Sequence, residues 1–310
     1  MLVLHVDTAT EWRGGQVQLM HLVRGMAERG CAVGVACPEG TPLWAALEGE
    51  GVERIALPPG RTVRGALKLA LSGADLVAAH TSHAHTTCLG VRRPLVVHRR
   101  VDFVPSGGWK YRRPEAFVAV SEAVARILRG AGAQRVAVVH DGVGTPPTVT
   151  PAADGPDVLA VGARVAHKGH RVLAAAAEAL PGVDIGVAGD GPLTYAGVRW
   201  LGHRDDVPAL LARARVFVHP SVEEGMGSAV VEAMLAGVPV VVTDAGGLPE
   251  VVGDTGVVVG TGDPAALAAA IRRVLNGDHP PVAAARARAE DLFGVDRMVD
   301  ATLAVYQGLL

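Results

Sequence analysis

The chain has 310 residues, enough for two domains of ordinary size, and 49% of them are apolar, enough for a sizeable core. Its net charge of −2 excludes a general electrostatic attraction to nucleic acid. The charge is uneven, however, because residues 1–148 contain 17 Lys and Arg against 12 Asp and Glu, whereas residues 149–310 contain 12 against 19. This asymmetry predicts that the first half binds an acidic ligand or partner.

In the first half, short apolar runs alternate with segments of helical periodicity, which favours an α/β fold with a parallel sheet. Helices are predicted at residues 16–28, which Gly30 would end, and at 121–129, for which Ser121 is a suitable N-cap. The predicted strands are 2–6, 32–36, 53–57, 75–79, 95–98, 116–120 and 135–139.

Residues 144–156 contain four prolines, too many for a helix or a central strand, and are predicted to be a linker. The alternation then restarts, with strands predicted at 157–161, 184–188, 198–200, 216–219, 239–243 and 256–259. Residues 296–310 have the pattern of an amphipathic helix, and that pattern does not decide on which domain the helix packs. Two α/β units joined by a linker predict a ligand site in a cleft between them.

The most informative stretch runs from Pro220 to Glu250, where a strand end, a glycine-bearing turn and a helix start follow one another. Backbone N–H groups at a helix start, here near Gly227 and Ser228, suit an anion. A carboxylate deeper in the helix, Glu232, suits sugar hydroxyls. A phosphate beside a sugar is the signature of a nucleotide-sugar.

Two further glycine-bearing turns follow predicted strands. Gly14 and Gly15 open the first helix, where backbone can approach a ligand closely, although turn geometry is the commoner reason for such glycines. Between Gly162 and Gly169, Arg164 and Lys168 place two cations at a strand's carboxyl end. That arrangement suits a diphosphate, with ordinary surface charge as the alternative.

Other interpretations of the acidic residues are weaker. Glu224 and Glu232 resemble a glycosidase pair, but eight residues of continuous helix would separate them by about 12 Å, more than either glycosidase geometry needs. Alternatively, Glu224 complements the helix dipole and Glu232 is solvated. Asp205 and Asp206 precede a helix, so we expect N-capping there and no metal site.

Histidines and arginines cluster in the first half. The spacing of His80, His83 and His85 is compatible with zinc, but no cysteine or carboxylate completes a ligand set nearby. Residues 92–113 form a basic run interleaved with aromatic residues, which predicts either a solvated surface or a patch for anionic lipid or a phosphorylated acceptor. No nucleic-acid-binding module accompanies it. The run contains Arg92, Arg93, Arg99, Arg100, Lys110, Arg112 and Arg113 with Phe103, Trp109 and Tyr111.

The cysteines and the first residues bear on the compartment. Cys31, Cys37 and Cys88 have neither paired nor metal-ligand spacing, which favours reduced thiols. No basic leader precedes residues 2–6, and no uncharged apolar run approaches the about 20 residues of a membrane span. We therefore expect a cytoplasmic protein, with peripheral contact at the inner membrane face left open.

Taken together, these segments resemble the retaining glycosyltransferases of the large group 1 (family 4) class, which have the GT-B fold. The resemblance covers nearly the whole chain and is most specific over 220–250, where Met226 replaces the usual phenylalanine. It implies two Rossmann-like domains whose parallel sheets face across a cleft. Residues 1–146 would form an acceptor-binding domain and residues 147–293 a nucleotide-sugar-binding domain, with the helix 294–310 crossing back to the first.

The resemblance also implies roles for individual residues. Arg164 and Lys168 would hold the donor diphosphate, Glu224 would contact donor sugar hydroxyls, and His98 would lie near the reacting sugar. His80 would be a further cleft-facing histidine. The remaining binding positions would be Gly14, Gly15, Gly162, Gly227, Ser228 and Glu232.

The implied reaction is transfer of a sugar from a nucleotide-sugar to an acceptor hydroxyl with retention of anomeric configuration, without a metal or other cofactor. The acceptor would be a glycan or a lipid-linked molecule in bacterial envelope polysaccharide, lipopolysaccharide or glycolipid synthesis. Two alternatives stay open. One is a UDP-sugar epimerase or phosphorylase of the same fold, and the other is a non-catalytic protein that binds nucleotide-sugars.

Overall fold

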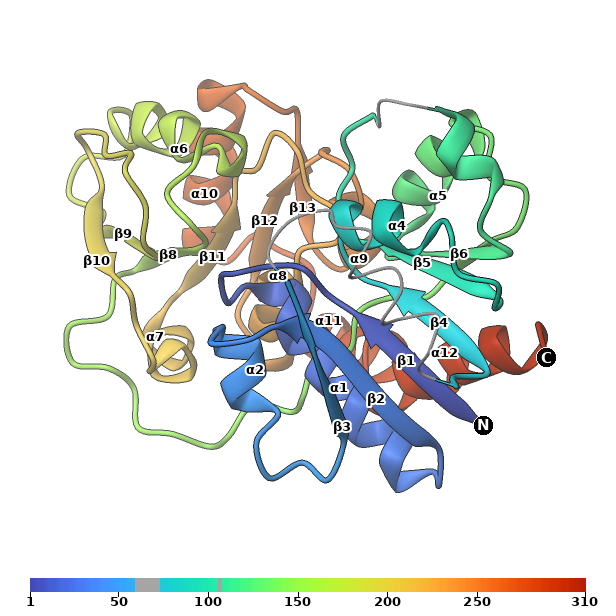
Figure 1. The fold of residues 1–310 in the computed structure, drawn as a ribbon. Coiled ribbons are helices and arrows are strands. Elements are labelled where there is room, and N and C mark those ends of the chain that lie inside the picture. The colour runs from blue at the N-terminus through green and yellow to red at the C-terminus, as the bar shows by residue number, and fades with distance from the viewer. Residues whose placement is uncertain (59–72, 105–107) are drawn as a thin grey trace. The chain divides into compact units, whose positions relative to one another are not determined.

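The computed structural model describes residues 1–58, 73–104 and 108–310 (Figure 1). It divides into two compact units. Unit 1 comprises residues 1–142 and 295–310, and unit 2 comprises residues 143–294. The paired strands of each unit form one parallel sheet with helices packed against it, which confirms the predicted α/β fold class of two Rossmann-like domains.

Unit 1 has a seven-stranded sheet in the order β3-β2-β1-β4-β5-β6-β7. The order reverses beside β1, because the chain first builds outward from β1 to β3 and then continues from β4 on the other side. In such sheets, ligands bind beyond the carboxyl ends of the strands at this reversal point. The strands are β1 (Leu2–Val6), β2 (Ala32–Pro38), β3 (Glu53–Leu57), β4 (Leu76–Ala79), β5 (Leu95–Arg99), β6 (Ala116–Ala119) and β7 (Val136–Val138).

The described helices of unit 1 pack against this sheet and against each other. Ser121 caps α5 by accepting a hydrogen bond from Val124 N, as its sequence context predicts. Gly30, with φ +75°, follows the end of α1. The helices are α1 (Gly14–Glu28), α2 (Pro42–Ala46), α4 (Ser82–Cys88), the 3₁₀ helix η1 (Gly108–Arg112), α5 (Glu122–Gly130) and α12 (Val295–Gln307).

The C-terminal helix α12 packs on α1. Gly25 of α1 permits this close approach, because a Cβ there would lie 2.6 Å from Val299 Cγ2. Val299 and Tyr306 are completely buried in the core of unit 1. Helix α12 therefore belongs to unit 1, although about 150 residues of unit 2 separate it from the rest of that unit.

Unit 2 has a six-stranded sheet in the order β10-β9-β8-β11-β12-β13, which reverses between β8 and β11. The strands are β8 (Val158–Val161), β9 (Ile185–Ala188), β10 (Arg199–Gly202), β11 (Val216–His219), β12 (Val240–Thr243) and β13 (Val257–Val259). All thirteen strands predicted from the sequence are present, with bounds that differ by no more than two residues. Residues 144–156 contain neither helix nor strand.

Helices α6 and α10 pack together and cover one apolar cluster of the unit 2 sheet, while α8 packs against α11. The helices are η2 (Ala166–Lys168), α6 (His170–Ala177), α7 (Val207–Arg213), α8 (Ser228–Leu235), α9 (Leu248–Val252), α10 (Pro264–Leu275) and α11 (Val282–Leu292).

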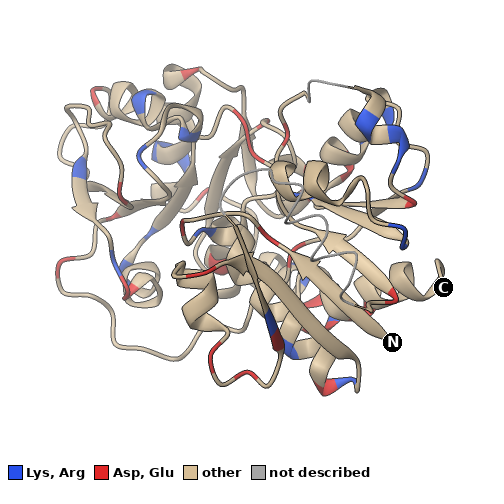
Figure 2. Cartoon of the chain, viewed as in Figure 1, with Lys and Arg blue, Asp and Glu red and all other residues tan. Residues whose placement is uncertain are grey.

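Charged residues lie mostly outside the strands in both units (Figure 2). Apart from β3, β5 and β10, the thirteen strands that the structure describes contain no Asp, Glu, Lys or Arg, as expected for parallel sheets that are buried on both faces. Over the part of the chain that the structure describes, no helix has the length and apolarity needed to cross a bilayer.

Candidate functional site

The candidate site of unit 2 lies at the point where its strand order reverses. The loop after β8 contains Arg164 and Lys168, and the loop after β11 contains Glu224 and ends at Gly227. Strands β8 and β11 are neighbours in the sheet, so their carboxyl ends bring the two loops together. The topology thus selects this edge as the ligand-binding edge.

The two loops are in direct contact through Gly169 and Pro220. Gly169 has φ +68°, and a Cβ on it would lie 1.8 Å from Pro220 O. Val222 N also donates to His167 O at 2.8 Å, and Thr243 Oγ1 of β12 donates to Ser221 O at 2.5 Å. Only glycine fits at position 169, which is why the loops can meet this closely.

Glu224 is the centre of a compact polar cluster. Its Oε2 lies 2.6 Å from Lys168 Nζ, 2.6 Å from His219 Nε2 and 3.2 Å from Ser221 Oγ. Burial by itself would raise the pKa of the Glu224 carboxyl. His219 and Lys168 each lower that pKa by a hydrogen bond and by charge. Together they outweigh burial and hold the pKa far below its ordinary value. Glu224 is therefore an ionised carboxylate at neutral pH.

Arg164 has an incompletely satisfied guanidinium. Its Nε is buried and has no hydrogen-bond partner among the residues described, while its Cζ lies 5.7 Å from the centre of the Trp200 ring. The backbone holds the residue in place, because Arg164 N donates to Asp190 O at 2.7 Å. Buried donors without partners are rare, so this one is a candidate for binding an anion or an acceptor oxygen.

Helix α8 begins beside this cluster without a side-chain cap. Gly227 occupies its N-cap position with φ +91°, and a Cβ there would lie 2.7 Å from Leu248 Cδ2. Ser228 is the first residue of the helix. Met226, which stands where phenylalanine is usual, is buried, so the replacement keeps an apolar side chain inside the fold. An N-terminus without a side-chain cap leaves backbone donors available to an anion.

Glu232 lies one turn further along α8 and is half-buried. Burial raises the pKa of its carboxyl, and no hydrogen bond or ion pair of that carboxyl is found with any described residue. Gly162, in the loop after β8, lies against the Lys168 alkyl chain, since a Cβ on it would be 3.6 Å from Lys168 Cδ. Lys168, Glu224 and Gly162 therefore form one cluster, with the start of α8 following on the same loop.

Unit 1 has a cavity of about 620 Å³ at the corresponding edge of its own sheet. The loops after β1, β4 and β5 line it, and its walls include Gly15, His80, His98 and Arg100. Gly14 and Gly15 start α1, and a Cβ on either would meet no atom within 4 Å. The fold of unit 1 therefore does not itself require glycine at these positions, which leaves ligand approach as a reason for them.

His98 lies in a buried polar chain at the floor of this cavity. Its Nε2 is 2.6 Å from Tyr306 Oη of α12, and its ring stacks on His80 with centroids 4.4 Å apart. His80 Nε2 is in turn 2.9 Å from His5 Nδ1. Burial, reinforced by the charge of Arg100, lowers the pKa of all three imidazoles, to about 3 for His5, so they are neutral at physiological pH.

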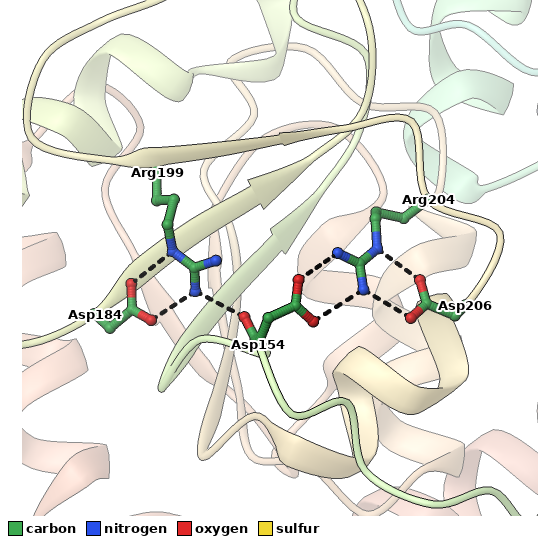
Figure 3. A network of polar contacts seen from close by, with 5 residues as sticks. All are labelled: Asp154, Asp184, Arg199, Arg204 and Asp206. Atoms are coloured by element: carbon green, nitrogen blue, oxygen red, sulfur yellow. Dashed lines mark hydrogen bonds and ion pairs between the residues drawn. The ribbon is translucent and has the colours of Figure 1, made fainter.

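The acidic pair Asp205 and Asp206 does not behave as predicted. Asp206 occupies the N-cap position of α7, but its carboxylate makes no capping hydrogen bond. It binds the Arg204 guanidinium instead, at 2.6 and 2.7 Å, and Arg204 also binds Asp154 (Figure 3). The prediction of a side-chain cap was wrong because a neighbouring arginine offers the carboxylate two charge-assisted hydrogen bonds.

The histidines of the first half do not form a metal site with other described side chains. Over the residues described, no group of three His, Cys, Asp or Glu side chains is placed to hold a metal ion. His85 is buried and its Nε2 contacts Lys110 O at 3.1 Å.

Sequence reasoning missed His219 and Ser221, which contact Glu224, and Tyr306, which contacts His98. A signal for His219 was present, since it is the last residue of a predicted strand, as His98 also is. Tyr306 had no such signal, because its partner lies 208 residues away in the sequence.

Comparisons with known proteins find matches in both halves of the chain. Residues 12–145 match the family model described as Glycosyltransferase Family 4, and residues 155–277 match the model described as Glycosyl transferases group 1. The 2-deoxystreptamine glucosyltransferase of Streptomyces kanamyceticus is 32% identical over 277 residues, which cover 74% of this chain and 71% of that protein.

The O-antigen chain mannosyltransferase B of Escherichia coli is 47% identical over 83 residues, which cover 26% of this chain and 22% of that protein's own length. Among solved structures, Anabaena Alr3699/HepE in complex with UDP-glucose superposes with a TM-score of 0.84 at 23% identity and covers the whole of both chains. At that identity the likeness concerns the fold, which is GT-B.

Proposed function

Since the chain belongs to the group 1 (family 4) glycosyltransferases, we propose that it transfers a sugar from a nucleotide-sugar donor to a hydroxyl group of an acceptor. The donor would bind to unit 2 at the loops after β8 and β11. The observation that carries the proposal is the buried Nε of Arg164, which has no hydrogen-bond partner among the described residues. It lies on the same loop as Lys168, at the carboxyl edge where the strand order reverses.

The donor diphosphate would lie against Arg164, Lys168 and the start of α8. Lys168 has three N–H donors and uses one of them for Glu224, which leaves donors for phosphate oxygens. Arg164 would supply its unpartnered Nε. The glycines Gly162 and Gly227, with Ser228, would let backbone amides approach the same oxygens.

The two glutamates would bind the sugar parts of the donor. Glu224 is ionised and held in one position by Lys168, His219 and Ser221, so it is organised in advance to accept hydrogen bonds from donor sugar hydroxyls. Glu232 is half-buried and has no polar partner among the described residues, and it would accept from the ribose hydroxyls. The sugar hydroxyls on Glu224 and the ribose hydroxyls on Glu232 would then replace water on carboxylates that are already partly desolvated.

The proposed chemistry breaks the bond between the anomeric carbon and the phosphate oxygen and forms a bond from that carbon to the acceptor oxygen. The acceptor proton would pass to the leaving phosphate oxygen on the same face, which gives retention. Arg164, Lys168 and the α8 N-terminus would stabilise the negative charge on the leaving group, so the mechanism needs no metal ion. His98, Gly14 and Gly15 would be the residues that unit 1 contributes to the reaction.

For the acceptor, we propose a glycan or lipid-linked molecule of bacterial envelope synthesis, handled in the cytoplasm. The aligned segment of the O-antigen chain mannosyltransferase supports this class. The name of the 2-deoxystreptamine glucosyltransferase points to a small aminocyclitol as the other acceptor class to be assayed.

Calorimetric titration tests donor binding. Wild-type protein is titrated with UDP-, GDP-, ADP- and CMP-sugars, alongside Lys168→Ala and the control Arg171→Ala. Arg171 is exposed and lies three residues after Lys168, in α6. We expect one base to bind, Lys168→Ala to weaken binding at least tenfold, and Arg171→Ala to bind as the wild type does. Equal affinity of the two variants would contradict the proposed diphosphate site.

Product analysis tests the reaction. With donor and acceptor mixtures, we expect nucleotide release that depends on acceptor, and an NMR coupling constant of the new glycosidic bond that matches the donor anomer. Lys168→Ala should lower turnover by orders of magnitude while the protein still folds, as shown by a cooperative thermal melting transition. Interconversion of donor sugars without acceptor would identify an epimerase, and binding without any turnover would identify a binding protein.

A further inference from the structure

Unit 1 exposes a group of large apolar side chains next to its cavity. Val101 is 41% exposed, Phe103 50%, Val104 81% and Trp109 68%. These four residues lie within nine positions of each other, and residues 105–107 between them are outside the described part of the chain. Apolar side chains exposed together at this level mark an interaction site more often than an ordinary surface. We call these four residues the apolar patch.

One residue of the apolar patch, Phe103, is held in place by contacts with Arg99. The Arg99 guanidinium stacks 4.7 Å from the centre of the Phe103 ring and donates to Phe103 O at 2.5 Å. On the other side, Tyr111 of η1 is buried, stacked on Phe117 with centroids 5.7 Å apart. Phe103 is therefore held in its exposed position by Arg99, and Trp109 lies two residues before the buried Tyr111 in the same 3₁₀ helix. An exposed side chain that is already held in place can contact a partner with little loss of conformational freedom.

Several arginines lie on η1, which contains Trp109, or next to it in the fold. Trp109 and Arg112 are three residues apart in the 3₁₀ helix η1, so their side chains lie on one face. Arg112 lies beside Gly132 after α5, whose exposed face carries Arg126. Arg113 donates to Leu89 O at 3.2 Å, which places it next to the loop with Arg92 and Arg93.

The balance of charge around the patch is strongly positive. Figure 2 shows blue residues gathered around α5 and the neighbouring loops. Of the acidic residues nearby, Glu122 pairs with Arg129, Glu115 accepts from Leu95 N, and Asp102 is half-buried. Arg92, Arg93, Arg112 and Arg126 form no ion pair with any residue that the structure describes.

We propose that this face of unit 1 docks on an anionic lipid bilayer surface, with Trp109, Phe103 and Val104 entering the interfacial region and the arginines contacting lipid phosphates. A tryptophan at such a boundary places its ring among the acyl chains and its N–H among the headgroups. Surrounding arginines add attraction to anionic lipid, which a protein partner with ordinary mixed charge would not require. Docking by this face is independent of the donor site in unit 2.

The test is co-sedimentation with phosphatidylcholine vesicles that contain or lack phosphatidylglycerol. Wild-type protein should bind the anionic vesicles, bind the neutral ones weakly, and detach as salt rises. Arg112→Gln/Arg113→Gln should lower the partition constant about fivefold for each arginine removed. Trp109→Ser/Val104→Ser should lower it at least tenfold.

Matched controls come from unit 2. Arg272→Gln/Arg273→Gln removes two adjacent exposed arginines from α10, and Val258→Ser removes a valine that is 40% exposed. Both variants should partition as the wild type does. Thermal melting of each variant shows that it is folded before its binding is measured.

Tryptophan fluorescence supplies a second readout. Brominated lipids should quench the wild-type protein, and the quenching should largely disappear in Trp109→Phe, which keeps an apolar ring. Equal binding to neutral and anionic vesicles, equal loss in patch and control variants, or no quenching of Trp109 would each overturn the proposal. Binding to a soluble protein partner through the same residues, without vesicle binding, would overturn it in favour of a protein interface.

Discussion

The hydroxyl of Tyr306 is the smallest group whose removal tests how α12 is held in unit 1. Tyr306 is completely buried, and its Oη lies 2.6 Å from His98 Nε2. Burial raises the pKa of the Tyr306 phenol and lowers that of the His98 imidazole, so both groups are neutral and the contact is an uncharged hydrogen bond. Tyr306→Phe removes one partner and leaves the ring nitrogen of His98 buried.

The expected cost follows from that burial. Leaving a buried polar group without its partner costs about 1–3 kcal/mol, because water cannot replace the lost hydroxyl. A value of about 2 kcal/mol lowers the melting temperature by about 4–8 °C for a domain of this size. The shape of the core changes little, since the ring remains in place.

Thermal unfolding of Tyr306→Phe, His98→Leu and the double variant measures this contact. The control is Tyr195→Phe in unit 2, because the half-buried Tyr195 hydroxyl makes no hydrogen bond with any described residue, so its loss should cost less than about 0.5 kcal/mol. The double variant should lose less than the sum of the two single variants by about 0.5–3 kcal/mol. Strict additivity, or a Tyr306→Phe shift no larger than that of Tyr195→Phe, would refute the reasoning.

Two further changes test the loops of unit 2. Gly169→Ala should destabilise unit 2 by about 3 kcal/mol or more, because its Cβ would overlap Pro220 O at a positive φ. Gly182→Ala, at φ +79° with no atom within 4 Å of its Cβ, should cost only about 1 kcal/mol, and equal melting temperatures of the two variants would contradict the loop contact. Glu224 has a folded-state pKa below its ordinary value of 4.5, so its contribution to stability is present above that pH and is lost as the pH falls further. The difference in unfolding free energy between wild type and Glu224→Gln, measured by urea titration, should therefore shrink on going from neutral pH to below pH 4.5, and a constant difference would rule out an ionised, paired Glu224.

Much of the fold could be predicted because its signals are local. A parallel strand buried on both faces, such as Val216–His219 or Val240–Thr243, is a short apolar run that can be recognised without knowing its neighbours. The prolines of residues 144–156 exclude helix and central strand by their own geometry. Gly169 and Gly227 mark turns because only glycine adopts their backbone angles without strain.

Those parts of the candidate site that follow directly after predicted strands could be predicted from the sequence. Arg164, Lys168 and Glu224 each follow a predicted strand, and parallel topology brings those ends to one edge. What each side chain contacts was not predictable in the same way. Asp206 was expected to cap α7, but its carboxylate binds the positively charged Arg204 guanidinium instead.

The amphipathic pattern of residues 296–310 determined that this segment is a helix, since periodicity depends only on neighbours one turn away. Only the tertiary structure decided that it packs on α1, where Gly25 leaves room for Val299, and that Tyr306 meets His98. Such partners are chosen by shape and hydrogen bonding between segments more than 200 residues apart, and no local pattern in the chain encodes that match.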